Sequence, residues 1–301
     1  MADRATLPAG RATVGRHARR GARRRPAPGP LLLRQIRHQN LLFWRSPISA
    51  FFTLLFPLVF LLLFNALQGD QTIESRDGIR FAQFFTPGIL AFAVVSACYT
   101  NLATSVPINR DEGVLKRVRG TPLPPWIYVA ARVGSAVWVA VLSAVLMVAV
   151  GVALFHVEVL WHLLPAAVVT LLLGAACFCA CGLAVASLCP SGEAAPAVAN
   201  FTILPVVFVS DIFYPLDQVP TWLQVAGSIF PVKHFALAVQ ADFNPFTEGS
   251  GFFWGHLVVI AVWLVAASVV ALRTFRWEPG TSTGRGSARR GRHRARRPPS
   301  G

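Results

Sequence analysis

The fold class rests first on IYVAARVGSAVWVAVLSAVLMVAVGVALF, residues 127–155. A helix needs about 20 predominantly apolar residues to cross about 30 Å of hydrocarbon. This stretch is longer than that and almost wholly apolar, so it predicts a membrane-spanning helix that tilts or continues past the membrane.

Five other apolar segments qualify as spans by the same criterion. The sequence therefore predicts an all-α integral membrane protein with six transmembrane helices. The fourth and fifth spans are separated only by the turn PSGEA, residues 190–194. The six expected spans are residues 48–67, 84–106, 127–155, 160–189, 195–214 and 252–272.

The composition excludes an ordinary soluble enzyme. The chain is 54% hydrophobic and 14% charged, whereas soluble domains are about 45–50% apolar and about 25% charged. Its basic residues are also segregated, with 11 of 28 in residues 1–47 and 9 in residues 273–301. We expect residues 31–276 to form one transmembrane domain, flanked by disordered basic tails at 1–30 and 277–301.

The basic tails, such as RRGRHRARR at 289–297, invite a nucleic-acid interpretation. They have almost no apolar residues and flank membrane spans, so we interpret them as topology determinants or contacts with membrane lipids. We expect no nucleic-acid partner. The first 30 residues contain no apolar run typical of a cleavable signal peptide.

The distribution of basic residues predicts the orientation. The connection 107–126 carries four Lys or Arg residues. The connection 68–83 carries two, which acidic residues offset, 156–159 carries none, and 215–251 carries only Lys233. Cytoplasmic loops are enriched in Lys and Arg. We therefore expect a multi-pass protein of the bacterial cytoplasmic membrane, with both termini, the 107–126 loop and the 190–194 turn in the cytoplasm.

Residues 31–45, LLLRQIRHQNLLFWR, are expected to form an amphipathic helix in the membrane interface. Its apolar face would carry Leu32, Leu33, Ile36, Phe43 and Trp44. Arg34, Gln35, Arg37, His38, Gln39 and Arg45 would lie mostly on the opposite face, while Asn40, Leu41 and Leu42 interrupt the pattern.

The sequence contains no recognisable catalytic motif. It lacks a GxxxxGK[ST] phosphate loop, and Lys116 and Lys233 are its only lysines. His156, His162 and Glu158 lie close together at a short outer turn, but a solvated loop is favoured there over a metal site. The five cysteines, Cys98, Cys177, Cys179, Cys181 and Cys189, are interpreted as small packing residues.

The loop 107–132 is the most informative polar segment. Arg110, Asp111, Glu112, Lys116, Arg117 and Arg119 crowd into ten residues. Val114, Leu115 and Val118 are spaced as one apolar stripe, which predicts a short helix over 110–119. Gly120 would end this helix in the usual way, and Pro122, Pro124 and Pro125 would prevent its continuation. A helix held between two spans is suited to transmit force from a soluble partner. On composition alone, the alternative is a solvated loop that only sets the topology.

Four stretches resemble the permease of a type-2 ATP-binding-cassette (ABC) transporter, in the drug and natural-product exporter branch, over about residues 31–276. DEGVLKRVRGTPLPPW (111–126) is the most specific of them. WRSPISAFFTLLFPLVFLLLF (44–64) resembles the first span, residues 190–224 the fifth span and the segment after it, and FPVKHFALAVQ (230–240) the outer helix before the last span.

The resemblance implies a dimer, as a homodimer or with a sister permease, and a separate cytosolic ATPase subunit. ATP and Mg belong to that partner, so this chain itself needs no cofactor and is not an enzyme. It also implies a cytoplasmic coupling helix, formed by Arg110, Asp111, Glu112, Gly113, Leu115, Lys116 and Arg117. ATP binding would then switch a central cavity from inward to outward.

Asp211 departs from the family pattern, which usually has a small neutral residue near the end of the fifth span. A carboxylate at depth is costly, so it should face water, a cavity or a partner. Three interpretations remain: an aqueous edge, a site for cationic amphipathic compounds, or an ion pair with Lys233. With Phe208 and Tyr214 it marks the candidate substrate path.

The leading hypothesis is therefore a permease for multidrug or antibiotic export, moving a hydrophobic or amphipathic compound outward. Lipid or polysaccharide export by the same kind of permease is the alternative. A proton-coupled carrier is disfavoured because no internal repeat is visible, and a lipid-modifying enzyme because no cluster of catalytic polar residues is visible.

Overall fold

The chain folds into a bundle of long helices. The structure is a computed structural model that describes residues 28–76, 78–120, 123–215, 219–247 and 249–275. Its elements are α1 (Pro28–Trp44), α2 (Pro47–Ala50), η1 (Phe51–Leu55), α3 (Phe56–Gln68), β1 (Thr72–Ile73), η2 (Glu74–Arg76), β2 (Ile79–Arg80), α4 (Phe81–Val95), η3 (Ser96–Thr100), α5 (Asn101–Asp111), α6 (Val114–Arg119), α7 (Pro125–Phe155), α8 (Leu164–Leu188), α9 (Ala195–Phe208), α10 (Thr221–Ile229), α11 (Pro231–Asp242) and α12 (Trp254–Thr274).

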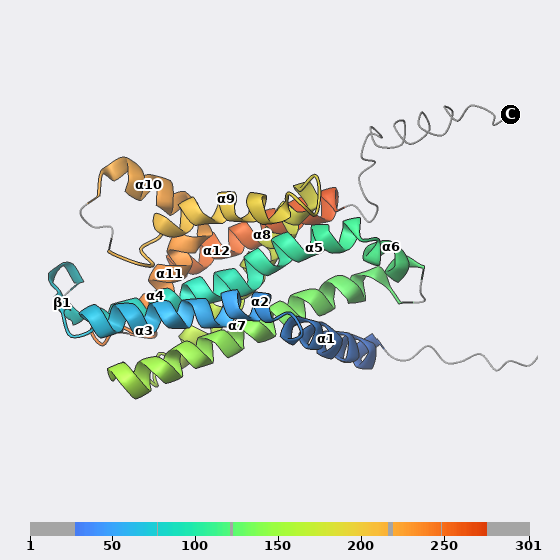
Figure 1. The fold of residues 1–301 in the computed structure, drawn as a ribbon. Coiled ribbons are helices and arrows are strands. Elements are labelled where there is room, and N and C mark those ends of the chain that lie inside the picture. The colour runs from blue at the N-terminus through green and yellow to red at the C-terminus, as the bar shows by residue number, and fades with distance from the viewer. Residues whose placement is uncertain (1–27, 77, 121–122, 216–218, 248, 276–301) are drawn as a thin grey trace, which may run out of the picture.

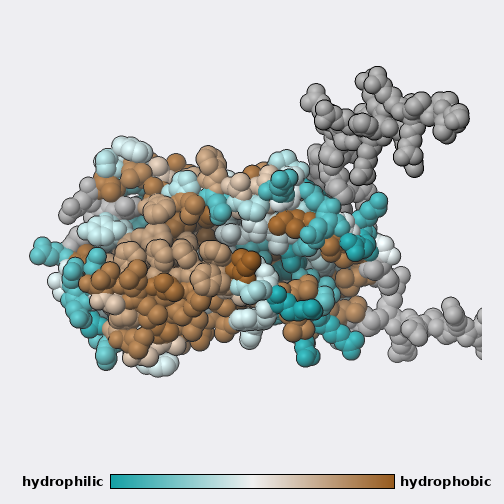
Figure 2. Space-filling view, viewed as in Figure 1, coloured by the Kyte–Doolittle hydropathy of each residue, from teal (hydrophilic) through white to brown (hydrophobic). Residues whose placement is uncertain are grey.

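Within these residues, five helices are long and apolar enough to cross a membrane. The surface agrees, because apolar residues cover much of the middle of the molecule and hydrophilic residues gather at its two ends (Figure 2). The expected all-α integral membrane class is confirmed. The five helices are Pro47–Gln68 (α2, η1 and α3), Phe81–Asp111 (α4, η3 and α5), Trp126–Phe155 (in α7), Leu164–Leu188 (α8) and Trp254–Thr274 (α12).

The expected fifth span, 195–214, is shorter than predicted. Its helix, α9, has 14 residues and ends at Phe208, so it is about 21 Å long at 1.5 Å per residue. The chain then turns, and Asp211 adopts a left-handed conformation with φ 56°. A non-glycine residue in that region cannot continue a right-handed helix. The apolar composition alone did not reveal this break.

The centre of the bundle is the second span. In α4, Phe85, Ile89 and Val94 have no exposed surface, and α4 packs against α3, α7 and α11. A second close contact joins α8 and α12 through Ala180, Ala184, Ala267 and Ala271. Small residues let helix backbones approach closely, which is how helices commonly associate in membranes.

The connections gather at two ends of the bundle. α1 and α6 lie at one end, and β1 and α10 at the other (Figure 1). The 190–194 turn lies at the α6 end, because Arg110 donates to the carbonyl oxygen of Cys189 over 3.0 Å. At the opposite end, Arg80 donates to the carbonyl oxygen of Phe155 over 2.8 Å. The 107–126 connection and the 190–194 turn therefore share one side.

The N-terminal amphipathic helix forms, but Gln39 lies differently from the prediction. α1 packs along α7, and Gln39 and Phe43 are its buried residues. Gln39 had been assigned to the polar face, but it meets α7, where its side-chain oxygen accepts a hydrogen bond from Arg132 over 3.0 Å. Leu33 and Trp44 of the expected apolar face are exposed, on the side where an interfacial helix would meet lipid.

Candidate functional site

The end of the second span carries the segment predicted to couple to a partner. The expected helix 110–119 is wrong in its first part: Arg110 and Asp111 finish α5, and Glu112 and Gly113 form a turn before α6. Gly113 has φ 72°, a conformation that glycine adopts at little cost. α6 then runs from Val114 to Arg119. Gly120 follows in a right-handed conformation, so it is not a left-handed cap.

Arg110 and Asp111 bind the chain itself. Arg110 is 5% exposed, and its guanidinium donates to the carbonyl oxygens of Cys189 at 3.0 Å and Pro190 at 3.3 Å. Asp111 accepts a hydrogen bond from the backbone N–H of Gly192 at 2.5 Å. These contacts tie the end of the second span to the turn between α8 and α9. These intramolecular contacts account for the charges of Arg110 and Asp111 without a partner subunit.

The remaining predicted coupling residues divide into buried and exposed groups. Leu115 has no exposed surface, so it anchors α6 to the bundle and is not available as a contact for another subunit. Glu112, Lys116 and Arg117 are exposed. Arg117 donates to the backbone carbonyl oxygen of Glu112 over 3.0 Å, which holds the turn against α6.

An open hollow of about 450 Å³ lies beside this turn. Ile108, Asp111, Glu112, Gly192 and Glu193 line it, so its side chains are largely acidic. Two connections that are 80 residues apart in the sequence build it together. The hollow and the adjacent basic residues of α6 form a mixed-charge surface, which we call the coupling surface and define by Glu112, Lys116, Arg117 and Glu193.

At the opposite end, Asp211 is enclosed by two basic side chains. It is 3% exposed. Its carboxylate lies 3.3 Å from the Lys233 ammonium and 3.5 Å from the Arg76 guanidinium, and its backbone carbonyl oxygen accepts from Gln240 at 2.8 Å. The interpretation as an exposed edge residue is therefore wrong, and the ion pair with Lys233 is present.

The other two residues of the predicted substrate path, Phe208 and Tyr214, are 66% and 69% exposed. They are thus not gathered with Asp211 into one enclosed pocket. The Phe208 ring lies 5.5 Å from that of Phe213, which in turn lies 5.7 Å from Phe92. This aromatic group joins the end of α9 to the C-terminal part of α4.

A cavity of about 580 Å³ lies below this aromatic group, between the first span, the second span and α9. It combines apolar walls with short polar side chains, a mixture typical of sites for amphipathic small molecules. Phe208 lies one helical turn beyond Leu204, on the same face of α9 that lines the cavity. The polar lining residues are Ser49, Thr53, Ser96, Thr100, Asn101, Thr104, Ser105 and Asn200.

The sequence analysis did not predict this cavity, although the sequence contains a feature that indicates it. Two helical turns at its wall, η1 and η3, are widened to π-helical geometry. Pro57 accounts for the first, because it has no N–H to donate to Thr53 and its ring crowds that carbonyl. Widened turns of this kind are frequent at functional sites. Short polar residues recurring within the first and second spans would have indicated the cavity.

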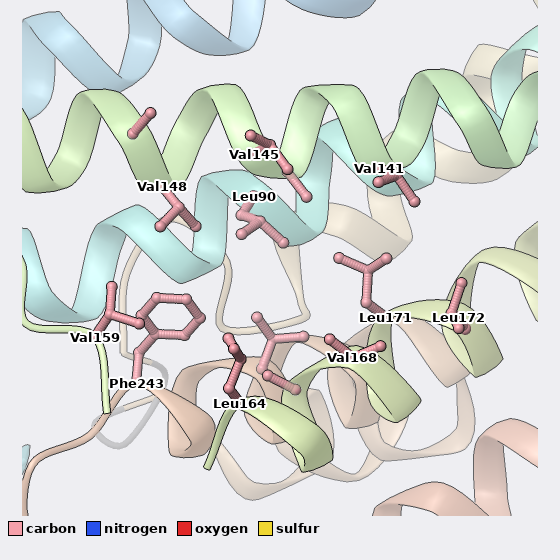
Figure 3. Close-up of a pocket in the computed structure, with 14 residues that line it drawn as sticks. Leu90, Val141, Val145, Val148, Val159, Leu164, Val168, Leu171, Leu172 and Phe243 are labelled. Atoms are coloured by element: carbon pink, nitrogen blue, oxygen red, sulfur yellow. The ribbon is translucent and has the colours of Figure 1, made fainter. Parts of the chain in front are cut away.

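A second cavity, of about 510 Å³, is entirely apolar. Figure 3 shows side chains from α4, α7 and α8, with Val159 and Phe243, converging on it. Val145 and Val168 on its rim are 60% and 48% exposed. Because no polar group lines it, this cavity can hold an apolar part of a ligand but cannot fix the orientation of that ligand.

Among the described residues, no group of three or more His, Cys, Asp or Glu side chains is placed to hold a metal ion. His156 and His162 are exposed, as is Glu158. Glu158 is engaged through its backbone, which exchanges hydrogen bonds of 2.8 and 2.9 Å with the Gln83 side chain. His234 and His256 contact each other across 2.8 Å through their Nδ1 atoms.

Comparison with known proteins gives a consistent result. The profile of the ABC-2 type transporter family matches residues 31–243. An inner membrane transport permease of Escherichia coli is 24% identical over 185 residues, which are 62% of this chain and 71% of the relative. A daunorubicin resistance ABC transporter permease of Streptomyces coeruleorubidus is 26% identical over 240 residues, covering 78% of this chain and 81% of the relative.

A probable multidrug ABC transporter permease of Escherichia coli is 24% identical over 160 residues, covering 53% of this chain and 43% of the relative. The family match spans most of the described helices, including the α5–α6 turn and the cavity beside α9. A transport permease of this family works with an ATPase, and the apolar helices make it a multi-pass inner membrane protein. The chain therefore belongs to the ABC-2 type transporter family, as an ABC transporter permease.

Proposed function

We propose that this permease exports a hydrophobic or amphipathic compound, of the drug or antibiotic kind, across the cytoplasmic membrane. The observation that carries the proposal is the mixed cavity between the first span, the second span and α9. Its volume of about 580 Å³ lies within the range of about 300–1,000 Å³ that small-molecule sites occupy. That size favours a single compact molecule over a polysaccharide. The relatives named for daunorubicin resistance and multidrug transport support the same class of compound.

In this proposal the α6 end faces the cytoplasm, and the coupling surface contacts the separate ATPase subunit. ATP and Mg²⁺ bind in that subunit, where phosphoryl transfer takes place. Closure of the ATPase subunits would push on the α5–α6 turn, and the push would reach α7 and the second span. Because Arg110 also holds the 190–194 turn, the same push would move α9, which forms one wall of the cavity.

A second permease, identical or related, would cover the open side of the cavity. Phe52 and Phe201 are 59% and 81% exposed, on the first span and on α9 beside the cavity. Two copies that meet there would enclose a shared path. The Phe92–Phe213–Phe208 group would lie between the cavity and the outer end, so the compound would have to pass it on the way out.

The test uses inside-out membrane vesicles that contain the permease and its co-expressed ATPase. ATP-driven uptake of a panel of fluorescent amphipathic compounds, with daunorubicin included, should appear only when ATP is present. Asn200→Trp should abolish uptake because it fills the cavity. Val145→Trp, a matched substitution at the apolar cavity of Figure 3, should leave uptake within about twofold. Loss of uptake in both variants, or in neither, would contradict the cavity assignment.

A further inference from the structure

A third cavity, of about 310 Å³, lies between α1, α5 and α7, beside the mixed cavity, with which it shares Ser49, Asn101, Ser105 and Ile108. Arg132 of α7 lines this cavity. Its Nη1 donates to the side-chain oxygen of Gln39 over 3.0 Å. Its Nε and Nη2 atoms are enclosed and have no hydrogen-bond partner within the described residues. A guanidinium has five N–H donors, and a buried charge left without acceptors is strongly unfavourable.

The cavity around Arg132 has no negative side chain. Its lining combines apolar residues with amides and hydroxyls, so Arg132 supplies its only formal charge. Every polar group there can donate a hydrogen bond, which suits an anion. The neutral polar lining residues are Gln39, Ser46, Ser49, Asn101, Ser105, Asn109 and Ser135.

The position of the cavity along the bundle narrows the kind of anion. α7 has 31 residues and is therefore about 46 Å long, roughly 16 Å more than the hydrocarbon core is thick. Arg132 lies seven residues from the first residue of α7, about 10 Å along the helix. If the excess length is shared between the two ends, Arg132 lies at the boundary between hydrocarbon and lipid headgroups.

α1 marks the same boundary independently. It is the amphipathic helix of the chain, and it crosses α7 at Arg132. Beside the Gln39 contact, Ser135 donates to the side-chain oxygen of Asn40. Arg34 and Arg37 of α1 are exposed. The cavity is thus roofed by an interfacial helix, at the depth of lipid phosphates.

We propose that this cavity binds the phosphate group of an anionic phospholipid, with Arg132 as its principal ligand. The guanidinium fork matches two phosphate oxygens. Because Nε and Nη2 are enclosed, binding requires a rotamer change in which Arg132 exchanges the Gln39 oxygen for phosphate oxygens. The lipid would then bridge α1, α5 and α7. A free phosphate has the same chemistry, so the test distinguishes the two sources. In the orientation of the proposed function, the lipid belongs to the inner leaflet.

The experiment measures lipid retention by the purified full-length chain, after delipidation in neutral detergent. Phosphatidylglycerol or phosphatidylcholine is added, with or without inorganic phosphate, in about 0.5 M salt so that exposed charges are largely screened. Wild type should retain phosphatidylglycerol in native mass spectra, and inorganic phosphate at equal concentration should not displace it. Arg132→Gln should weaken retention at least tenfold. Arg45→Gln, which removes the same charge from an exposed position just beyond the end of α1, should change it less than twofold.

Two results would overturn the proposal. One is equal retention of phosphatidylglycerol by wild type and Arg132→Gln. The other is displacement of the lipid by inorganic phosphate, which would assign the cavity to a free anion. Should Arg132→Gln fail to fold, Asn109→Phe narrows the cavity without touching the arginine and should show the same loss. The measurement needs neither ATPase nor transported compound, so its outcome is independent of the proposed export function.

Discussion

The guanidinium of Arg110 lies 3.0 Å from the carbonyl oxygen of Cys189, across 79 residues of sequence. The contact joins the end of the second span to the turn that opens α9. The contact thereby holds together the α5–α6 turn and the 190–194 turn, the two connections at this end of the bundle. A force on the α5–α6 turn therefore acts on α9 as well as on α5 and α7, and α9 lines the mixed cavity.

Replacement of Arg110 by glutamine should uncouple these elements. Hydrogen bonds to charged groups contribute about 1.5–3 kcal/mol each, and this guanidinium is buried, so the variant should lose stability of that order. A lower midpoint of thermal unfolding in detergent is the expected result. Arg37→Gln, at an exposed position of α1, is the matched control. Equal stability of the two variants would contradict the tether.

Glu112→Ala should leave expression and membrane insertion intact but abolish substrate-stimulated ATP hydrolysis and export. Its side chain is exposed on the coupling surface, and a few residues usually dominate an interface. The measurement is ATPase activity of the reconstituted complex with and without substrate. Arg292→Ala, in a segment outside the described residues, should change neither. Normal coupling in the Glu112 variant would refute the assignment.

Leu115→Asp should behave differently from Glu112→Ala. Leu115 has no exposed surface, so the substitution buries a charge among apolar neighbours, which is strongly unfavourable. We expect loss of folded protein, measured as the monodisperse fraction in detergent, rather than a folded but uncoupled complex. The contrast distinguishes residues that hold α6 against the bundle from exposed residues that could contact the ATPase.

Asp211→Asn should weaken export of cationic and neutral compounds equally. The Asp211 side chain is 4% exposed and pairs with Lys233 and Arg76, whose side chains are 14% and 30% exposed, so its neutralisation removes ion pairs that hold this end of the bundle whatever compound is carried. Lys233→Met in the same chain should restore part of the stability. A loss confined to cationic compounds would instead show that Asp211 recognises the substrate.

Asp242 should make stability fall as pH rises. Burial raises the pKa of its carboxyl group to about 7, although the nearby Thr170 hydroxyl partly opposes the shift. Between about pH 4 and pH 7 the folded chain then holds a proton that the unfolded chain has lost. Stability should decline across that window and level off above it. In Asp242→Asn this decline, measured by thermal unfolding, should disappear, and the variant should be more stable than wild type at pH 8.

The orientation can be tested with single cysteines in a chain whose five native cysteines are replaced. Cysteines at Ser75 and Thr247 should react with an impermeant thiol reagent in intact cells, because their connections carry few basic residues. A cysteine at Ser287, in the basic region outside the described residues, should react only after the membrane is opened. Labelling of Ser287 in intact cells would reverse the proposed orientation.

The elements that depend on local composition were predictable from the sequence alone. The runs at 48–67, 127–155 and 252–272 become helices Pro47–Gln68, Trp126–Phe155 and Trp254–Thr274. In a membrane a run of about 20 apolar residues must satisfy its own backbone as a helix. The membrane class follows for the same reason. The short helix after the second span was predicted separately, from the spacing of Val114, Leu115 and Val118.

Contacts between distant side chains, in contrast, could be known only from the folded chain. After α9 ends at Phe208, Asp211 adopts a left-handed conformation beside Lys233 and Gln240. Likewise the sequence did not show that Arg110 binds the carbonyl oxygen of Cys189 or that Leu115 is buried, while the coupling role of this segment stays a prediction. These roles rest on contacts between residues far apart in the chain. Composition and periodicity describe neighbours along a helix, whereas burial and charge pairing depend on what the rest of the fold brings alongside.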